Sequence, residues 1–156
     1  YTTNEVNNLI KNFDNVKDAY DIGLWNQLAL IESCDVFISP HTGFAFLAPC
    51  VGTPWLEIAG SNWAAYFYNK VSFYSVMPNN KNYPYEGGAD EDIVEGHVRG
   101  MNPKLLDKKI PEIINGLKLL LDKKFTYQKA EEKHMNNLKK ANIKHERMLK
   151  APLEKF

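Results

Sequence analysis

Residues 33–54 read SCDVFISPHTGFAFLAPCVGTP, and this stretch decides the fold. The continuous apolar run at residues 36–38 predicts a buried strand. Residues 41–43 predict a tight polar turn, residues 43–51 a short helix, and Pro54 the opening of a second strand. This order places backbone N–H groups and a helix N-terminus at the carboxyl end of a parallel strand, where an anion such as phosphate is favoured. The stretch therefore predicts a site for a nucleotide or a nucleotide-sugar.

The rest of the chain continues an alternation of helices and strands. Apolar residues at helical spacing predict helices over residues 3–13, 24–33, 111–123 and 127–149. Strands are predicted over residues 15–20, 36–38, 55–59 and 71–76, and a long loop over residues 77–102. We expect strand 36–38 to be central and helix 24–33 to be well buried, and both Pro103 and Pro111 to mark helix starts.

This alternation predicts an α/β fold with a Rossmann-like parallel sheet flanked by helices and a C-terminal helical extension. Residues 1–125 form the Rossmann-like domain in this interpretation. Residues 126–156 form a C-terminal helix that packs back on the domain or on a missing N-terminal domain. Because the chain starts at Tyr1 without an initiator Met, we expect a piece of a larger protein.

Composition restricts the possible partners. The 156 residues carry 19 basic and 19 acidic side chains, and this balance gives no indication of nucleic-acid binding. Residues 1–100 hold 5 basic and 12 acidic side chains, whereas residues 101–156 hold 14 basic and 7 acidic ones. Two interpretations stay open: a solvated helical face, or a basic tail that docks on an acidic domain, a phosphate or a membrane surface.

The two cysteines, Cys34 and Cys50, lie in apolar surroundings, so we expect buried free thiols rather than a disulfide. No run reaches the roughly 18 apolar residues of a membrane span. A cytoplasmic location is expected, with peripheral membrane association left open.

Residues 22–60 resemble the C-terminal, donor-binding domain of the ADP-heptose:LPS heptosyltransferase family, which are GT-B glycosyltransferases. The resemblance rests on a small-residue–Asp strand entry at Cys34-Asp35, an apolar strand, a Thr-Gly turn at Thr42-Gly43, a short helix, and Gly52-Thr53-Pro54. The chain departs from the family at His41, where an acidic residue is usual, and at Phe46, where a His is frequent.

The resemblance implies the nucleotide-sugar donor-binding half of a glycosyltransferase that transfers a hexosyl or heptosyl group to a glycan or lipid-linked acceptor. The binding site for the acceptor and the catalytic base would both lie in a missing N-terminal domain. No catalytic residue is therefore expected in this chain, and we expect the chain alone to be inactive. Helix N-termini and positive groups hold the departing diphosphate in such enzymes, so no metal or other cofactor is expected. The alternative is a non-catalytic α/β interaction module without a nucleotide site.

Candidate site residues follow from the turn and from the resemblance. The donor-phosphate contacts are Ser39, His41, Thr42, Gly43 and Phe44. By resemblance, Ile22 and Gly23 flank the base and Glu5 the ribose, although a plain connection and a helix-dipole partner explain them equally well. Glu57 lies in an apolar strand, and its carboxylate must reach solvent or a partner, so it is a candidate sugar contact.

Overall fold

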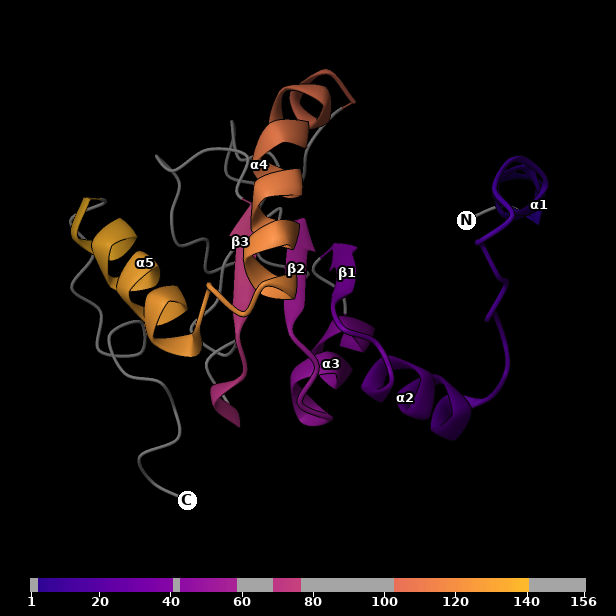
Figure 1. The fold of residues 1–156 in the computed structure, drawn as a ribbon, viewed down its shortest axis with the longest axis horizontal. Coiled ribbons are helices and arrows are strands. Elements are labelled where there is room, and N and C mark those ends of the chain that lie inside the picture. Colours follow the sequence, from indigo (N-terminus) through magenta and orange to yellow (C-terminus); the bar gives the residue numbers. More distant parts are fainter. Residues whose placement is uncertain (1–2, 41–42, 59–68, 77–102, 141–156) are drawn as a thin grey trace, which may run out of the picture.

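The computed structural model describes residues 3–40, 43–58, 69–76 and 103–140 (Figure 1). Its helices are α1 (Thr3–Asn12), α2 (Leu24–Glu32), a 3-10 helix η1 (Gly43–Phe46), α3 (Leu47–Cys50), α4 (Pro103–Leu121) and α5 (Tyr127–Lys140). Its strands are β1 (Phe37–Pro40), β2 (Trp55–Ile58) and β3 (Phe73–Val76). The expected α/β class is confirmed, and the expected loop over residues 77–102 lies outside the described residues.

The three strands form one parallel sheet in the order β1-β2-β3. Strand β1 therefore lies at an edge of the described sheet. The apolar run at residues 36–38 had predicted a central strand, and this prediction is wrong for the described sheet. Phe37 N–H donates to Pro54 O at 2.8 Å, so by the alternation of a parallel ladder the N–H and C=O of Ile38 point away from β2. Pro40, which has no N–H to donate, ends β1 and is typical of an edge strand.

Helices cover the two faces of the sheet unequally. On one face, Trp55 and Phe73 form a buried cluster with residues of α2, η1, α3 and α5. On the other face, Leu56, Tyr74 and Val76 pack against Leu120 of α4, and Figure 1 shows α4 lying across β2 and β3. Apolar side chains at period 2 in the strands thus supply both halves of the core.

Helix α4 is one continuous element of 19 residues with Pro111 inside it. The sequence predicted two helix starts there, because proline removes a backbone donor. The stripe of Ile113, Leu117 and Leu120 runs on past Pro111 and packs on the sheet, which compensates for the missing hydrogen bond. Gly116 is buried where α4 crosses Tyr74, and a Cβ there would lie 2.6 Å from the ring.

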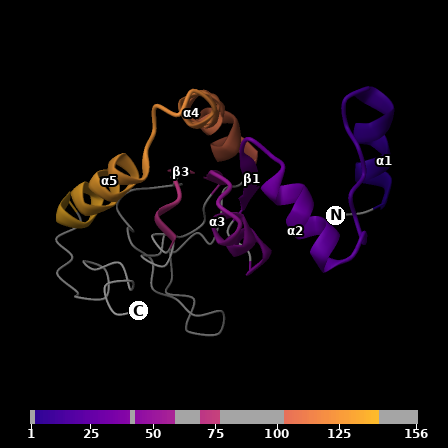
Figure 2. The same cartoon turned by 60° about the horizontal axis from the view of Figure 1, so that its bottom comes forward.

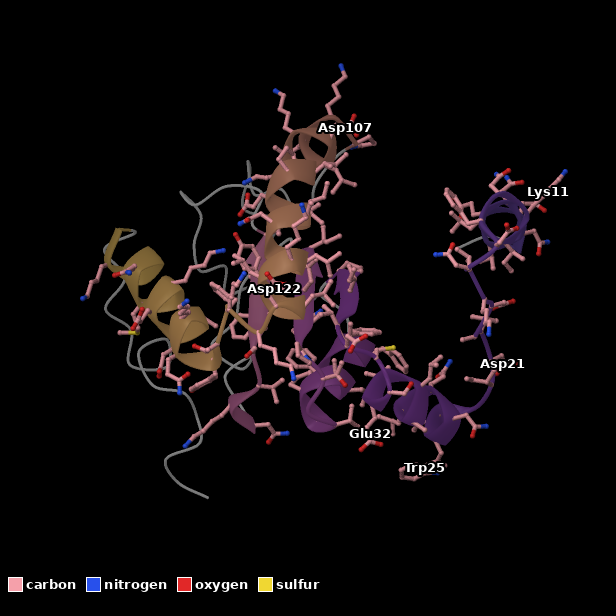
Figure 3. The ribbon with its side chains drawn as sticks, in the orientation of Figure 1. Lys11, Asp21, Trp25, Glu32, Asp107 and Asp122 are labelled. Carbon is pink, nitrogen blue, oxygen red and sulfur yellow. The ribbon has the colours of Figure 1, made fainter. Side chains whose placement is uncertain are left out.

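The N-terminal segment packs far less than its sequence predicted. Residues 15–20 form no strand: Asp18 Oδ1 accepts a hydrogen bond from Tyr20 N–H at 2.8 Å, which favours a local turn over a ladder. In α2 only Ile31 is buried, and Trp25 is 81% exposed; Figure 3 shows Trp25 projecting from the outer end of the helix. Helix α1 stands clear of the sheet on the β1 side in both views (Figures 1 and 2).

Cys34 and Cys50 form no disulfide, as expected, but both are exposed rather than buried. Cys34 follows the C-terminus of α2, where its Sγ donates to Leu30 O at 3.2 Å. Cys50 ends the short helix α3. Both lie at element ends on the surface, which the apolar neighbours in the sequence did not indicate.

Candidate functional site

The carboxyl ends of β1, β2 and β3 lie at one edge of the sheet, because the strands are parallel. Of the expected donor contacts, Ser39 lies in β1 and Phe44 lies in η1 with 39% of its surface exposed. Gly43 is the first residue of η1. His41 and Thr42 follow β1 directly in the sequence, outside the described residues.

The helix predicted over residues 43–51 is split in two. Gly43–Phe46 is a 3-10 helix, and α3 is a single α-helical turn that includes Pro49. A 3-10 segment and one α turn align few peptide dipoles, so the field at Gly43 is much smaller than that of a long helix. An anion at this edge would depend on individual backbone N–H groups and side chains.

The motif Gly52-Thr53-Pro54 lies just before the amino end of β2, at the end of the strand away from the expected site, and it has a structural role there. Gly52 adopts φ +84°, the left-handed region that favours glycine. The buried Thr53 hydroxyl donates to Ile31 O at 2.8 Å, which ties the C-terminus of α2 to the start of β2. This part of the resemblance is therefore explained by packing without a ligand.

A row of polar residues crosses the sheet near its carboxyl edge. Strand register sets Ser39 beside Glu57 and Glu57 beside Ser75. Trp55 Nε1–H donates to Ser39 Oγ at 3.0 Å. Ser75 is buried, and its Oγ has no hydrogen-bond partner among the described residues. This row is the main group of polar side chains that the fold brings toward the expected site.

Glu57 is fully buried at the centre of this row. Of the two alternatives that the sequence left, solvent or a partner, exposure to solvent is ruled out. Burial of a carboxylate is costly unless polar groups surround it, and the flanking serines contribute polar groups at this level of the sheet. Sequence reasoning did not single out Ser75, although its period-2 position after Phe73 was a signal for it.

The expected base and ribose contacts lie elsewhere. Gly23 caps the N-terminus of α2 with φ 86°, and the Ile22 carbonyl accepts a hydrogen bond from Asn26 Nδ2 at 2.7 Å. Glu5 is exposed in the first turn of α1, a helix that stands apart from the sheet. The structure does not bring these three residues to the carboxyl end of β1, where Ser39 lies.

One charged residue near the row was missed in the sequence. Lys133 of α5 donates from Nζ to Ser75 O at 3.0 Å, and its Nζ lies 3.8 Å from the centroid of the Tyr74 ring. Burial lowers the pKa of Lys133 from its usual 10.5, while the nearby Glu112 carboxylate raises it in part. Burial also raises the pKa of Tyr74, as does Glu112. The charge run around Lys133 had indicated only a solvated face or a docking tail.

Among the described residues, no three His, Cys, Asp or Glu side chains are grouped to hold a metal ion. The described helices include none that is long and apolar enough to cross a membrane. Comparisons of the chain with known protein families, with curated proteins and with solved structures found no match.

Proposed function

We propose that this chain is the nucleotide-sugar-binding α/β domain of a glycosyltransferase. One observation carries the proposal: the parallel sheet sets a polar row, Ser39, Glu57 and Ser75, next to the carboxyl edge of the strands. Open α/β sheets bind their ligands outside this edge. In the sequence, His41-Thr42-Gly43 follows directly after β1.

The proposed chemistry is binding of a diphosphate by fixed donors. Backbone N–H groups around Gly43 and the hydroxyl of Thr42 would donate to phosphate oxygens. Phe44 of η1 is partly exposed and offers an apolar surface. Glu57 is fully buried, so its proposed role is to position the polar groups of the row and not to touch the sugar.

Calorimetric titration of the full chain with ADP-, GDP- and UDP-sugars tests the proposal. We expect saturable binding of one nucleotide class, and loss of that binding in Gly43→Val without unfolding. Ser39→Ala is expected to weaken binding, because the row loses a hydroxyl near the edge. Ser33→Ala is the matched control: Ser33 is the C-cap residue after α2, and its hydroxyl donates to Leu30 O at 2.7 Å. Equal affinities of the two serine variants would contradict the proposed site.

The alternative of a non-catalytic interaction module is favoured by one observation, the exposed apolar side chains on the β1 side. Leu24 and Trp25 of α2 and Ile38 of β1 are all exposed. Absence of binding to all three nucleotide-sugar classes, in a chain shown to be folded, would favour this alternative.

A further inference from the structure

The β1 side of the sheet carries an uncovered apolar surface on the face that α4 packs on. Strand register places Ile38 beside Leu56, which is buried under α4, yet Ile38 itself is 46% exposed. On α4, Ile110, Ile114 and Leu121 are exposed at spacings of four and seven residues, which keeps them on one side of the helix.

This side of α4 is directed toward β1. Gly116 lies against the Tyr74 ring, and the Glu112 carboxylate is near enough to raise the pKa of Tyr74, so these two residues mark the β3 side of the helix. Leu117, on the same side as Ile110, packs in the cluster that includes Val36, the residue just before β1. We call the surface formed by Ile38, Ile110, Ile114 and Leu121 the β1-side surface.

Helix α1 carries a second apolar surface that no other described helix or strand covers. Leu9 and Ile10 of α1 and Phe13, just after the helix, are exposed at helical spacing, at 50, 37 and 53%, while Asn4 and Asn8 lie on the opposite face. Helix α1 stands on the same side of the molecule as β1 (Figures 1 and 2).

We propose that α1 docks onto the β1-side surface of its own chain. The eleven residues 13–23 between α1 and α2 can span at most about 40 Å when extended, so the linker allows α1 to approach the neighbouring sheet edge. Charge favours the approach of this segment to α4 through the linker, where Asp14, Asp18 and Asp21 lie, whereas α1 itself holds one acidic and one basic side chain. Residues 3–23 hold four acidic and two basic side chains, whereas α4 holds four basic and two acidic ones. Docking would bury two amphipathic surfaces that otherwise remain in water.

A double-mutant cycle on the full chain tests the contact. Ile10→Asp and Ile110→Asp are each expected to lower the melting temperature by about 5 °C. The double variant should have about the same melting temperature as the less stable of the two single variants, because both changes remove the same contact. The matched controls are Asn8→Asp on the polar face of α1 and Lys108→Asp at an exposed position of α4. The proposal would be overturned if neither Ile10→Asp nor Ile110→Asp lowered the melting temperature, or if the two shifts were fully additive in the double variant.

Disulfide trapping identifies which copy supplies α1. In a chain with Cys34→Ser and Cys50→Ser, the pair Ile10→Cys and Ile110→Cys should oxidise within one molecule. The pair Asn8→Cys and Ile110→Cys, on the wrong face of α1, should oxidise much more slowly. A disulfide-linked dimer as the main product would show that a second copy provides the helix and would overturn docking within one chain.

Discussion

The two edge strands of the described sheet, β1 and β3, differ in how far other parts of the chain cover them. At β3, the C-terminal half of the chain covers the edge: Lys133 donates to Ser75 O, and Phe125 packs edge-on against Tyr74 at 4.9 Å between ring centroids. At β1, Ile38 is exposed and α1 stands apart. The comparison teaches that the C-terminal helices α4 and α5 each add a buried apolar residue to the core, Leu120 and Ala130, whereas α1 adds none and α2 adds only Ile31.

The largest expected effect is at the β3 side, where α4 crosses the sheet. Gly116→Val would put a branched side chain where even a Cβ lies 2.6 Å from the Tyr74 ring. We expect a loss of about 2–3 kcal/mol in the free energy of unfolding, since overpacking forces the helix away from the sheet. Urea unfolding measures it. Lys118→Val, at an exposed position of the same helix, should cost only about 0.5 kcal/mol; equal losses would mean that Gly116 is not packed against Tyr74.

Lys133→Met removes the side chain that covers the β3 edge. The variant loses a hydrogen bond to Ser75 O and a cation–π contact with Tyr74, and we expect a loss of about 1–2 kcal/mol. Hydrogen exchange of the β3 amides should speed up in parallel. Lys139→Met, at an exposed position of the same helix, is the control. If the two lysine variants unfold at the same urea concentration, the edge is not held by Lys133.

The pH dependence of stability sharpens the same comparison. Burial lowers the pKa of Lys133 below its unfolded value of 10.5, so between the two values the unfolded state binds more protons. The free energy of unfolding should therefore rise with pH in that window. The deficit of Lys133→Met against the unsubstituted chain should grow as pH approaches 10.5, while that of Lys139→Met stays constant. A deficit that shrinks with rising pH would contradict the lowered pKa.

The smallest expected effect is on the N-terminal side. Trp25 is 81% exposed, so Trp25→Ser should change the free energy of unfolding by less than about 0.5 kcal/mol. Acrylamide should quench the Trp25 fluorescence readily. A loss above about 1 kcal/mol would show that Trp25 is covered in solution and that the two edges are more alike than the structure indicates.

Much of the fold was predictable because local patterns determine elements. The apolar run at Val36–Ile38, the start at Pro54 and the alternation before Val76 predicted β1, β2 and β3 within two residues. The order of the strands in the sheet was not predictable in the same way. An apolar run does not tell whether a strand has one partner or two, and the proline at position 40 was the overlooked signal for an edge.

The prediction that helix 24–33 is well buried was wrong for a related physical reason. The pattern of Leu24, Leu28 and Ile31 correctly predicted α2, but amphipathic spacing identifies a face without showing that another element covers it. The opposite error occurred at Lys133, which the charge run indicated to be solvated or part of a docking tail and which the fold places on an aromatic ring.

The candidate site was predictable where residues follow one another in the chain and not where they meet by register. Ser39 lies in β1 and Phe44 in η1, on either side of the stretch that the sequence singled out. Ser75 enters the row through pairing with Glu57, and no local pattern indicates that pairing. The expected roles of Ile22 and Gly23 placed them at a turn after a strand over residues 15–20, which the chain does not form. Glu5 lies in the first turn of α1, a helix that stands apart from the sheet.

The proline at the end of β1 has a consequence for the behaviour of concentrated solutions. A foreign strand that approaches this edge would find backbone donors only before position 40, since Pro40 carries no N–H. Aggregation by edge-to-edge addition of strands is therefore limited to a very short ladder. Replacement of Pro40 by a β-branched residue would lengthen that ladder and should make the protein more prone to form fibrils.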